Sequence, residues 1–160
     1  MAYSIHDKSF WLWLIPDEDS IHKINLTRTI LEIRNGTTDF PLHITLGPID
    51  DLTPNLYSTV EEFSKNLSML NAEFSCRINY GNYFNSIGLV PNDLPFFNNK
   101  LHSILSKIQY NFNIKRDTHL SLAYTKLENN HKNIVYNDCI KFSKLAIAFV
   151  DEKNKIWKVL

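Results

Sequence analysis

The chain has 160 residues, 44% of them hydrophobic, which is enough for one domain to bury a core without a disulfide or a metal to hold it. Its 17 basic residues balance 17 acidic ones, so no basic field exists to bind a long nucleic acid. The two cysteines lack a CxxC spacing, and the apolar run at 10–15 is too short for a signal sequence or a membrane span. We therefore expect one cytoplasmic domain, residues 1–160, that acts as a monomer and has no membrane partner.

The first half of the chain alternates predicted strands and helices. The stretch FWLWLI, residues 10–15, predicts a strand that Pro16 ends. From residue 17 the apolar period becomes helical, and residues 40–49, FPLHITLGPI, then predict a short buried strand. The clearest helix is predicted over 51–71, with Thr53 as its N-cap.

The second half repeats this order after a hairpin. Residues 74–90 predict two strands, and the apolar stripe in 96–112, after Pro95, predicts a third helix. A strand around residues 117–125, DTHLSLAYT, follows, and two strands at 141–150 and 155–160 close the chain. Antiparallel strands with helices to one side indicate an α+β fold. Because a helix precedes each histidine-bearing strand, the halves resemble a worn duplication that would bring these two strands together.

The two histidine-bearing strands share a pattern. His43 and Thr45 are two residues apart, as are His119 and Ser121, so each pair lies on one face of its strand, while the intervening apolar residues face the core. One such pair in a chain of this length is usually structural. Two copies, each followed by Leu in an apolar strand, favour a functional interpretation.

Two histidines in one cleft suit phosphodiester hydrolysis. A neutral imidazole can take a proton from water while a protonated one supplies a proton to the leaving oxygen. The hydroxyls of Thr45 and Ser121 would hold the negative charge that develops on the phosphate. This chemistry asks for no cofactor, and the remaining histidines lack the spacing of zinc ligands, so we expect no metal site.

HITL and HLSL, about half a chain apart, resemble the motif pair of the 2H phosphoesterase superfamily. LWLIPDED near the start and HLSLAYTKL are similar to the eukaryotic 2′,3′-cyclic nucleotide phosphodiesterase branch. The resemblance implies a bilobal, pseudo-duplicated α+β fold, with antiparallel sheets, helices outside and a central cleft. It also implies His43 and His119 as catalytic acid and base, and Thr45 and Ser121 as phosphate-binding residues.

The same resemblance implies aromatic residues that stack on the substrate base. Carried over by position, these are Trp13, Phe84 and Tyr124. Trp13 and Phe84 are equally typical of core filling. Strict alternation from His119 turns Tyr124 away from the ligand face unless a bulge intervenes.

These observations support a metal-independent phosphodiesterase that hydrolyses a cyclic or 2′-linked nucleotide phosphodiester, with a small nucleotide or short oligonucleotide as its substrate. Two alternatives stay open. The chain could be a phage or viral enzyme that degrades cyclic oligonucleotide or 2′,5′-oligoadenylate signals in the host cytoplasm, to which its Asn-, Ile- and Lys-rich composition leans mildly. It could instead be a nucleotide-binding module without turnover.

Overall fold

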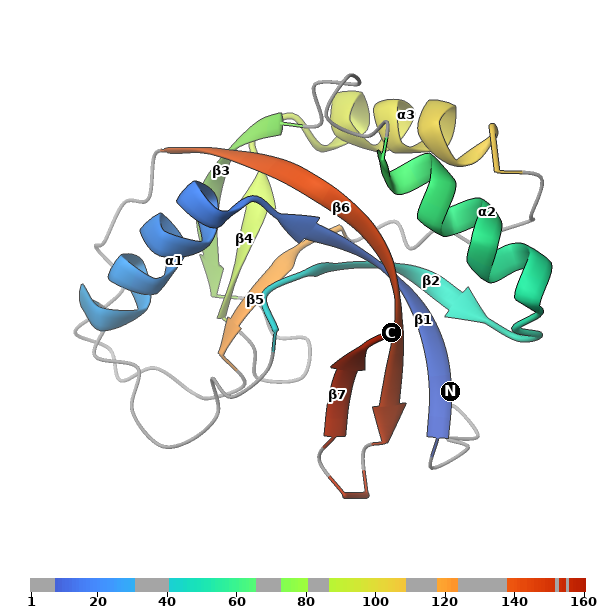
Figure 1. Cartoon of the computed structure of the whole chain (residues 1–160). Coiled ribbons are helices and arrows are strands. Elements are labelled where there is room, and N and C mark those ends of the chain that lie inside the picture. The colour runs from blue at the N-terminus through green and yellow to red at the C-terminus, as the bar shows by residue number, and fades with distance from the viewer. Residues whose placement is uncertain are drawn as a thin grey trace.

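The computed structural model describes residues 8–30, 41–65, 73–80, 87–108, 118–123, 138–151, 153–154 and 156–160. Figure 1 shows its strands and helices. The strands are β1 (Lys8–Pro16), β2 (Ile44–Ile49), β3 (Glu73–Tyr80), β4 (Ile87–Pro91), β5 (Leu120–Ala123), β6 (Asp138–Asp151) and β7 (Ile156–Val159). The helices are α1 (Glu18–Ile30), α2 (Pro54–Lys65) and α3 (Leu94–Leu105). No helix in these ranges is long and apolar enough to cross a membrane.

The strands pair in a ring. Its order is β1, β2, β5, β4, β3 and β6, with β6 pairing back onto β1 and β7 added to β6. Every described pairing is antiparallel. The predicted α+β class with an antiparallel sheet is therefore confirmed, and β2 and β5, from different halves of the chain, are neighbours. The duplicated, two-lobed architecture stays a prediction.

The main core lies between the helices and one face of the sheet. In Figure 1, α2 and α3 lie together on the outer side of the arch that β6 and β1 form. Buried residues of all three helices join the apolar side chains of the strands there: Ile24 of α1, Leu56 and Val60 of α2, and Phe97, Leu101 and Leu105 of α3. Beside Trp13, both Leu12 and Leu14 enter this core, so alternation turns Trp13 to the opposite face.

The long strand β6 reverses its alternation once. The β1 partner shifts from Lys144 to Phe142 between Ile15 and Pro16, which leaves Ser143 as an extra residue. Phe142 is buried before this bulge and Leu145 after it. A bulge bends its strand, and here it lets β6 direct apolar side chains into the core on both sides of the bend.

The helix starts show one correct and one wrong prediction. The predicted N-cap of α2 is confirmed, because the Leu56 amide donates to Oγ1 of Thr53 at 3.1 Å. The predicted start of the third helix after Pro95 is wrong. α3 begins at Leu94, and Asp93 caps it by accepting from the Phe96 amide at 3.1 Å. Proline is tolerated in a first helical turn because its missing N–H needs no partner there.

Candidate active site

The two motifs meet where β2 pairs with β5. Ile44 pairs with Leu120, and both are fully buried in the core, so the neighbouring motif residues occupy the other face. Continued by one residue in each direction, this antiparallel register sets each histidine across from the hydroxyl residue of the other strand: His43 from Ser121, and His119 from Thr45. The apolar partners Ile44, Leu46, Leu120 and Leu122 are buried, as the period-two pattern predicted.

His43 is held at two points. Its Nδ1 lies 2.6 Å from the carbonyl oxygen of Pro41. Because a carbonyl only accepts, Nδ1 carries the proton and donates it, so in the neutral ring the lone pair is on Nε2. The imidazole also stacks on the indole of Trp13, with 3.6 Å between the ring centroids and 11° between the ring planes. The bond sets the in-plane orientation of the imidazole, and the stack sets its plane.

The surroundings of His43 favour its neutral form. Burial lowers the pKa of His43 from 6.5 to about 4, the bond to the Pro41 carbonyl raises it, and the positive charge of His119 lowers it. A stacked indole would favour the cation by roughly 0.5–2 kcal/mol, whereas a shift of this size corresponds to about 3 kcal/mol. Burial therefore outweighs the indole. The effect of His119 also shows that the two imidazoles are close enough to interact.

His119 lies over a glycine of the next strand. Gly88 pairs with Ser121 across the β4–β5 ladder. A Cβ added at Gly88 would lie 3.2 Å from the carbonyl oxygen of Leu120 and 3.5 Å from Cδ2 of His119. The absent side chain thus lets the backbone of β5 at Leu120 approach β4 closely beside His119, in keeping with the rule that a glycine inside a strand often marks a close approach.

Side chains of two helices anchor the short strand β5 at its ends. Thr118, just before His119, donates from Oγ1 to Oδ1 of Asn98 on α3 at 2.8 Å. At the other end, Nε of Arg28 on α1 donates to the carbonyl oxygen of Leu122 at 3.0 Å. Arg28 stands at an apolar position of the α1 pattern, and this bond explains why an arginine is placed there. Both helices therefore help to position the second motif.

The exposures of the predicted site residues differ. His43 and Ser121 are buried, at 8% and 6% exposed, while Thr45 and His119 are partly buried. Trp13 is 1% exposed, so a nucleotide base has no access to its ring in this conformation; base stacking by Trp13 stays a prediction that requires the side chain to move. The other two predicted stacking residues, Phe84 and Tyr124, lie outside the described residues.

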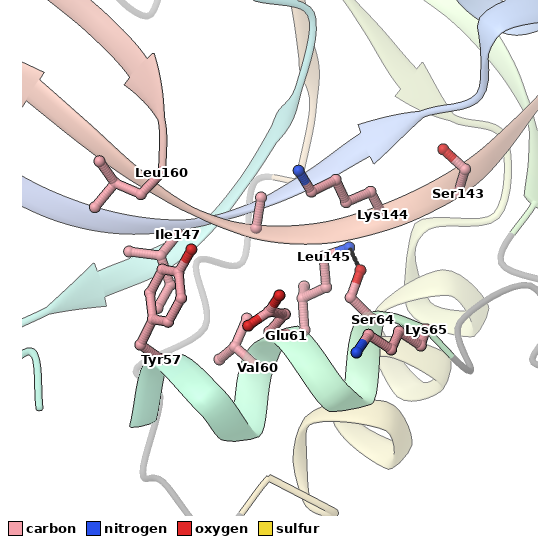
Figure 2. Close-up of a pocket in the computed structure, with 11 residues that line it drawn as sticks. Tyr57, Val60, Glu61, Ser64, Lys65, Ser143, Lys144, Leu145, Ile147 and Leu160 are labelled. Atoms are coloured by element: carbon pink, nitrogen blue, oxygen red, sulfur yellow. Dashed lines mark hydrogen bonds between the residues drawn. The ribbon is translucent and has the colours of Figure 1, made fainter. Parts of the chain in front are cut away.

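A pocket of about 440 Å³ lies elsewhere, between α2 and β6. Figure 2 shows that Tyr57 and Glu61 of α2 face the strand across it, and that Leu160 lies at one end. Ser64 closes part of the gap, because its Oγ accepts from the Leu145 amide at 2.9 Å. The lining includes none of the motif residues, so this pocket is separate from the candidate site.

Sequence reasoning missed two features of the site. Gly88 carried a usable signal, since an isolated glycine in the predicted strand SIGLV indicates a bulge or a close approach. For the Trp13–His43 stack, the sequence indicated only which face of its strand Trp13 occupies. Among the described residues, no group of three or more His, Cys, Asp or Glu is placed to share a metal ion.

The comparisons with known proteins relate the fold of this chain to that of solved structures. No protein-family model matches the sequence, and no curated protein matches it. A solved phosphoesterase aligns over 96% of this chain and 95% of its own, at 10% identity and a TM-score of 0.52. E. coli LigT complexed with 3′-AMP aligns over 96% and 94%, at 12% identity and a TM-score of 0.52, and its apo form at 11% and 0.51 over the same shares. At these identities the likeness shows a shared fold.

Proposed function

We propose that this chain is a phosphodiesterase of the 2H type that hydrolyses a cyclic or 2′-linked nucleotide phosphodiester without a metal. The observation that carries the proposal is the pairing of β2 with β5, which sets His43 and His119 on one sheet face, each opposite a hydroxyl residue. The fold shared with a phosphoesterase and with LigT supports it. So does the ligand of the LigT complex, because a 3′-monophosphate is what remains when a 2′,3′-cyclic phosphate loses its bond to the 2′-oxygen.

The two histidines take different roles in this proposal. His43, buried and with its pKa lowered to about 4, is neutral near pH 7 and acts as the base through Nε2. Water attacks the phosphorus and passes a proton to His43. The bond from phosphorus to the 2′-oxygen breaks as His119 gives that oxygen a proton. Exchange with solvent then restores both imidazoles.

Thr45 and Ser121 bind the phosphate in this scheme. Each follows a histidine by two residues, so their hydroxyls reach the space between the two imidazoles from both strands. Hydrogen bonds to the non-bridging oxygens would hold charge where it develops in the transition state. A histidine followed two residues later by a hydroxyl residue occurs once in each half of the chain, and this repetition supports the duplicated, two-lobed architecture that the sequence predicts.

The test is turnover of a panel of substrates. The protein is incubated with 2′,3′-cyclic AMP, with cyclic di- and trinucleotides and with 2′,5′-oligoadenylate, and products are separated by chromatography. We expect a linear or monophosphate product from at least one, with the His43→Ala/His119→Ala double variant as the blank. Turnover of only the cyclic oligonucleotides or the oligoadenylate would favour the anti-defence alternative. Binding without any product would overturn the enzyme and leave the nucleotide-binding module.

Chelation should leave the rate unchanged. The proton transfers and the charge stabilisation come from side chains in this scheme, so excess EDTA removes nothing that the reaction needs. The measurement is the initial rate before and after EDTA and gel filtration, followed by addition of Mg²⁺ or Zn²⁺. A rate that EDTA abolishes and a metal restores would contradict the mechanism.

A methyl group at Gly88 should slow the reaction. In Gly88→Ala the new Cβ would lie 3.2 Å from the Leu120 carbonyl oxygen, so the backbone next to His119 must give by a few tenths of an ångström, while the 3.5 Å contact with the His119 ring is an ordinary one. Because a misplacement of about 1 Å can cost about a hundredfold in rate, a shift of this size should cost up to roughly tenfold. The readout is kcat, with circular dichroism to verify that the variant folds. Wild-type kcat in folded Gly88→Ala would show that the position of His119 does not depend on this close approach.

A further inference from the structure

Trp13 is buried on the face of the sheet that lies away from the helices. It is 1% exposed, although its strand neighbours Leu12 and Leu14 fill the main core on the opposite side. Its packing partners on its own face are small or apolar residues of the neighbouring strands, among them Ala148 and Val150 of β6. An aromatic ring that only filled core volume would need no contact with the candidate catalytic group. Trp13 makes such a contact.

The contact is close to parallel stacking. The indole and the His43 imidazole are separated by 3.6 Å between centroids, with 11° between their planes. Rotation of the imidazole about its Cβ–Cγ bond would break the stack and also the 2.6 Å bond from Nδ1 to the Pro41 carbonyl. The two contacts therefore select one ring orientation and one tautomer of His43, the tautomer whose Nε2 can accept a proton.

We propose that Trp13 is a positioning residue for the first histidine of the site: its indole holds the His43 imidazole in one plane and excludes water from one face of the ring. This inference rests on the proposed function for its effect on rate. The geometry of the stack gives it a second consequence that is independent of turnover. Removing the indole should let water reach His43 and make the protonated ring easier to form.

Among the residues that the structure describes, few charged groups compete with this effect. On β1 the residues next to His43, Trp13 and Ile15, are uncharged. Just before β5 the facing titratable group is His119, whose positive charge already lowers the pKa of His43. On β6 the basic residue that pairs with Ile15 is Lys144, which is exposed. If the pKa of His43 changes when the indole is removed, the change would therefore report mainly the exposure of the His43 ring to water.

The experiment compares Trp13→Leu with Trp13→Phe and uses Trp11→Leu, two residues along the same strand face, as the matched control. Each variant is assayed against pH with a base-bearing substrate and with a base-free cyclic phosphate. In the wild type the acidic limb should lie at about pH 4, where His43 loses its proton. Trp13→Leu should lower kcat by about ten- to a hundredfold on both substrates, leave KM unchanged and move the acidic limb upward toward 6.5. Trp13→Phe, which keeps a ring, should lie close to the wild type.

Imidazole NMR makes the inference testable without turnover. In the wild type, the His43 ring protons should be shifted upfield by the indole and the Nδ1–H tautomer should dominate. In Trp13→Leu the midpoint of the His43 titration should rise from about 4 toward 6.5. The upfield shift and the tautomer of the wild-type protein test the inference even if Trp13→Leu does not fold. If the signals hold but no substrate is turned over, the proposed function fails while the positioning stands.

Three results would overturn the inference. The first is a wild-type His43 without the upfield shift. The second is a folded Trp13→Leu protein in which kcat, the acidic limb and the His43 titration all match the wild type, which would make Trp13 a packing residue. The third is a loss seen only in KM for base-bearing substrates, which would return Trp13 to the base-stacking role.

Discussion

Replacing His43 or His119 with alanine is expected to lower kcat/KM by about a hundred- to ten-thousandfold, because each removes one of the two proton transfers. The double variant should be little worse than either single one, since a base without its acid, or an acid without its base, no longer completes the reaction. The measurement is kcat/KM on the best substrate of the panel, with circular dichroism to verify that each variant folds.

The chain offers a matched control. His102 is an exposed histidine on α3 that stands outside both motifs, so His102→Ala should keep the wild-type rate. Near-wild-type turnover in either motif variant would make that histidine structural. Additive losses in the double variant would show that the two histidines act in separate steps, against the concerted scheme.

Acid should destabilise the protein through His43. Its pKa is about 4 when folded and 6.5 in the unfolded chain, so between these values the unfolded state binds more protons and the free energy of unfolding falls as pH falls. The contribution of His43 is fully present above pH 6.5 and lost below pH 4. A shift of this size amounts to about 3 kcal/mol, which is a large share of the stability of a typical domain.

His43→Phe isolates this effect from the titration of the carboxyl groups. The variant keeps a ring against Trp13 but has no proton to bind, so its free energy of unfolding should fall less between pH 7 and pH 4 than that of the wild type. Urea denaturation at both pH values gives the two differences, and their difference should approach about 3 kcal/mol. Equal pH dependence in the two proteins would mean that His43 is not buried as the structure has it.

The sequence by itself determined the features that depend on local periodicity. Alternation put Ile44 and Leu120 in the core and their motif neighbours on the other face, and the structure confirms both. The threonine-proline start of α2 was equally legible, because an N-cap needs only the residues of its own first turn. The start of α3 was not, since a proline inside the first turn reads as a boundary until the capping Asp93 is considered.

Only the tertiary structure decided how the two halves of the site meet and why they differ. The pairing of β2 with β5 joins segments far apart in the chain, and no local pattern sets that register. Burial, and with it the lowered pKa of His43, depends on what packs over the ring, which the motif itself does not specify. The same holds for Trp13. Alternation along its strand predicts which face it occupies, but only the packing of side chains between strands shows that its indole covers the His43 imidazole. Gly88 likewise stood in a strand that the sequence predicts, and only the pairing with β5 shows that its missing side chain admits the Leu120 carbonyl next to His119.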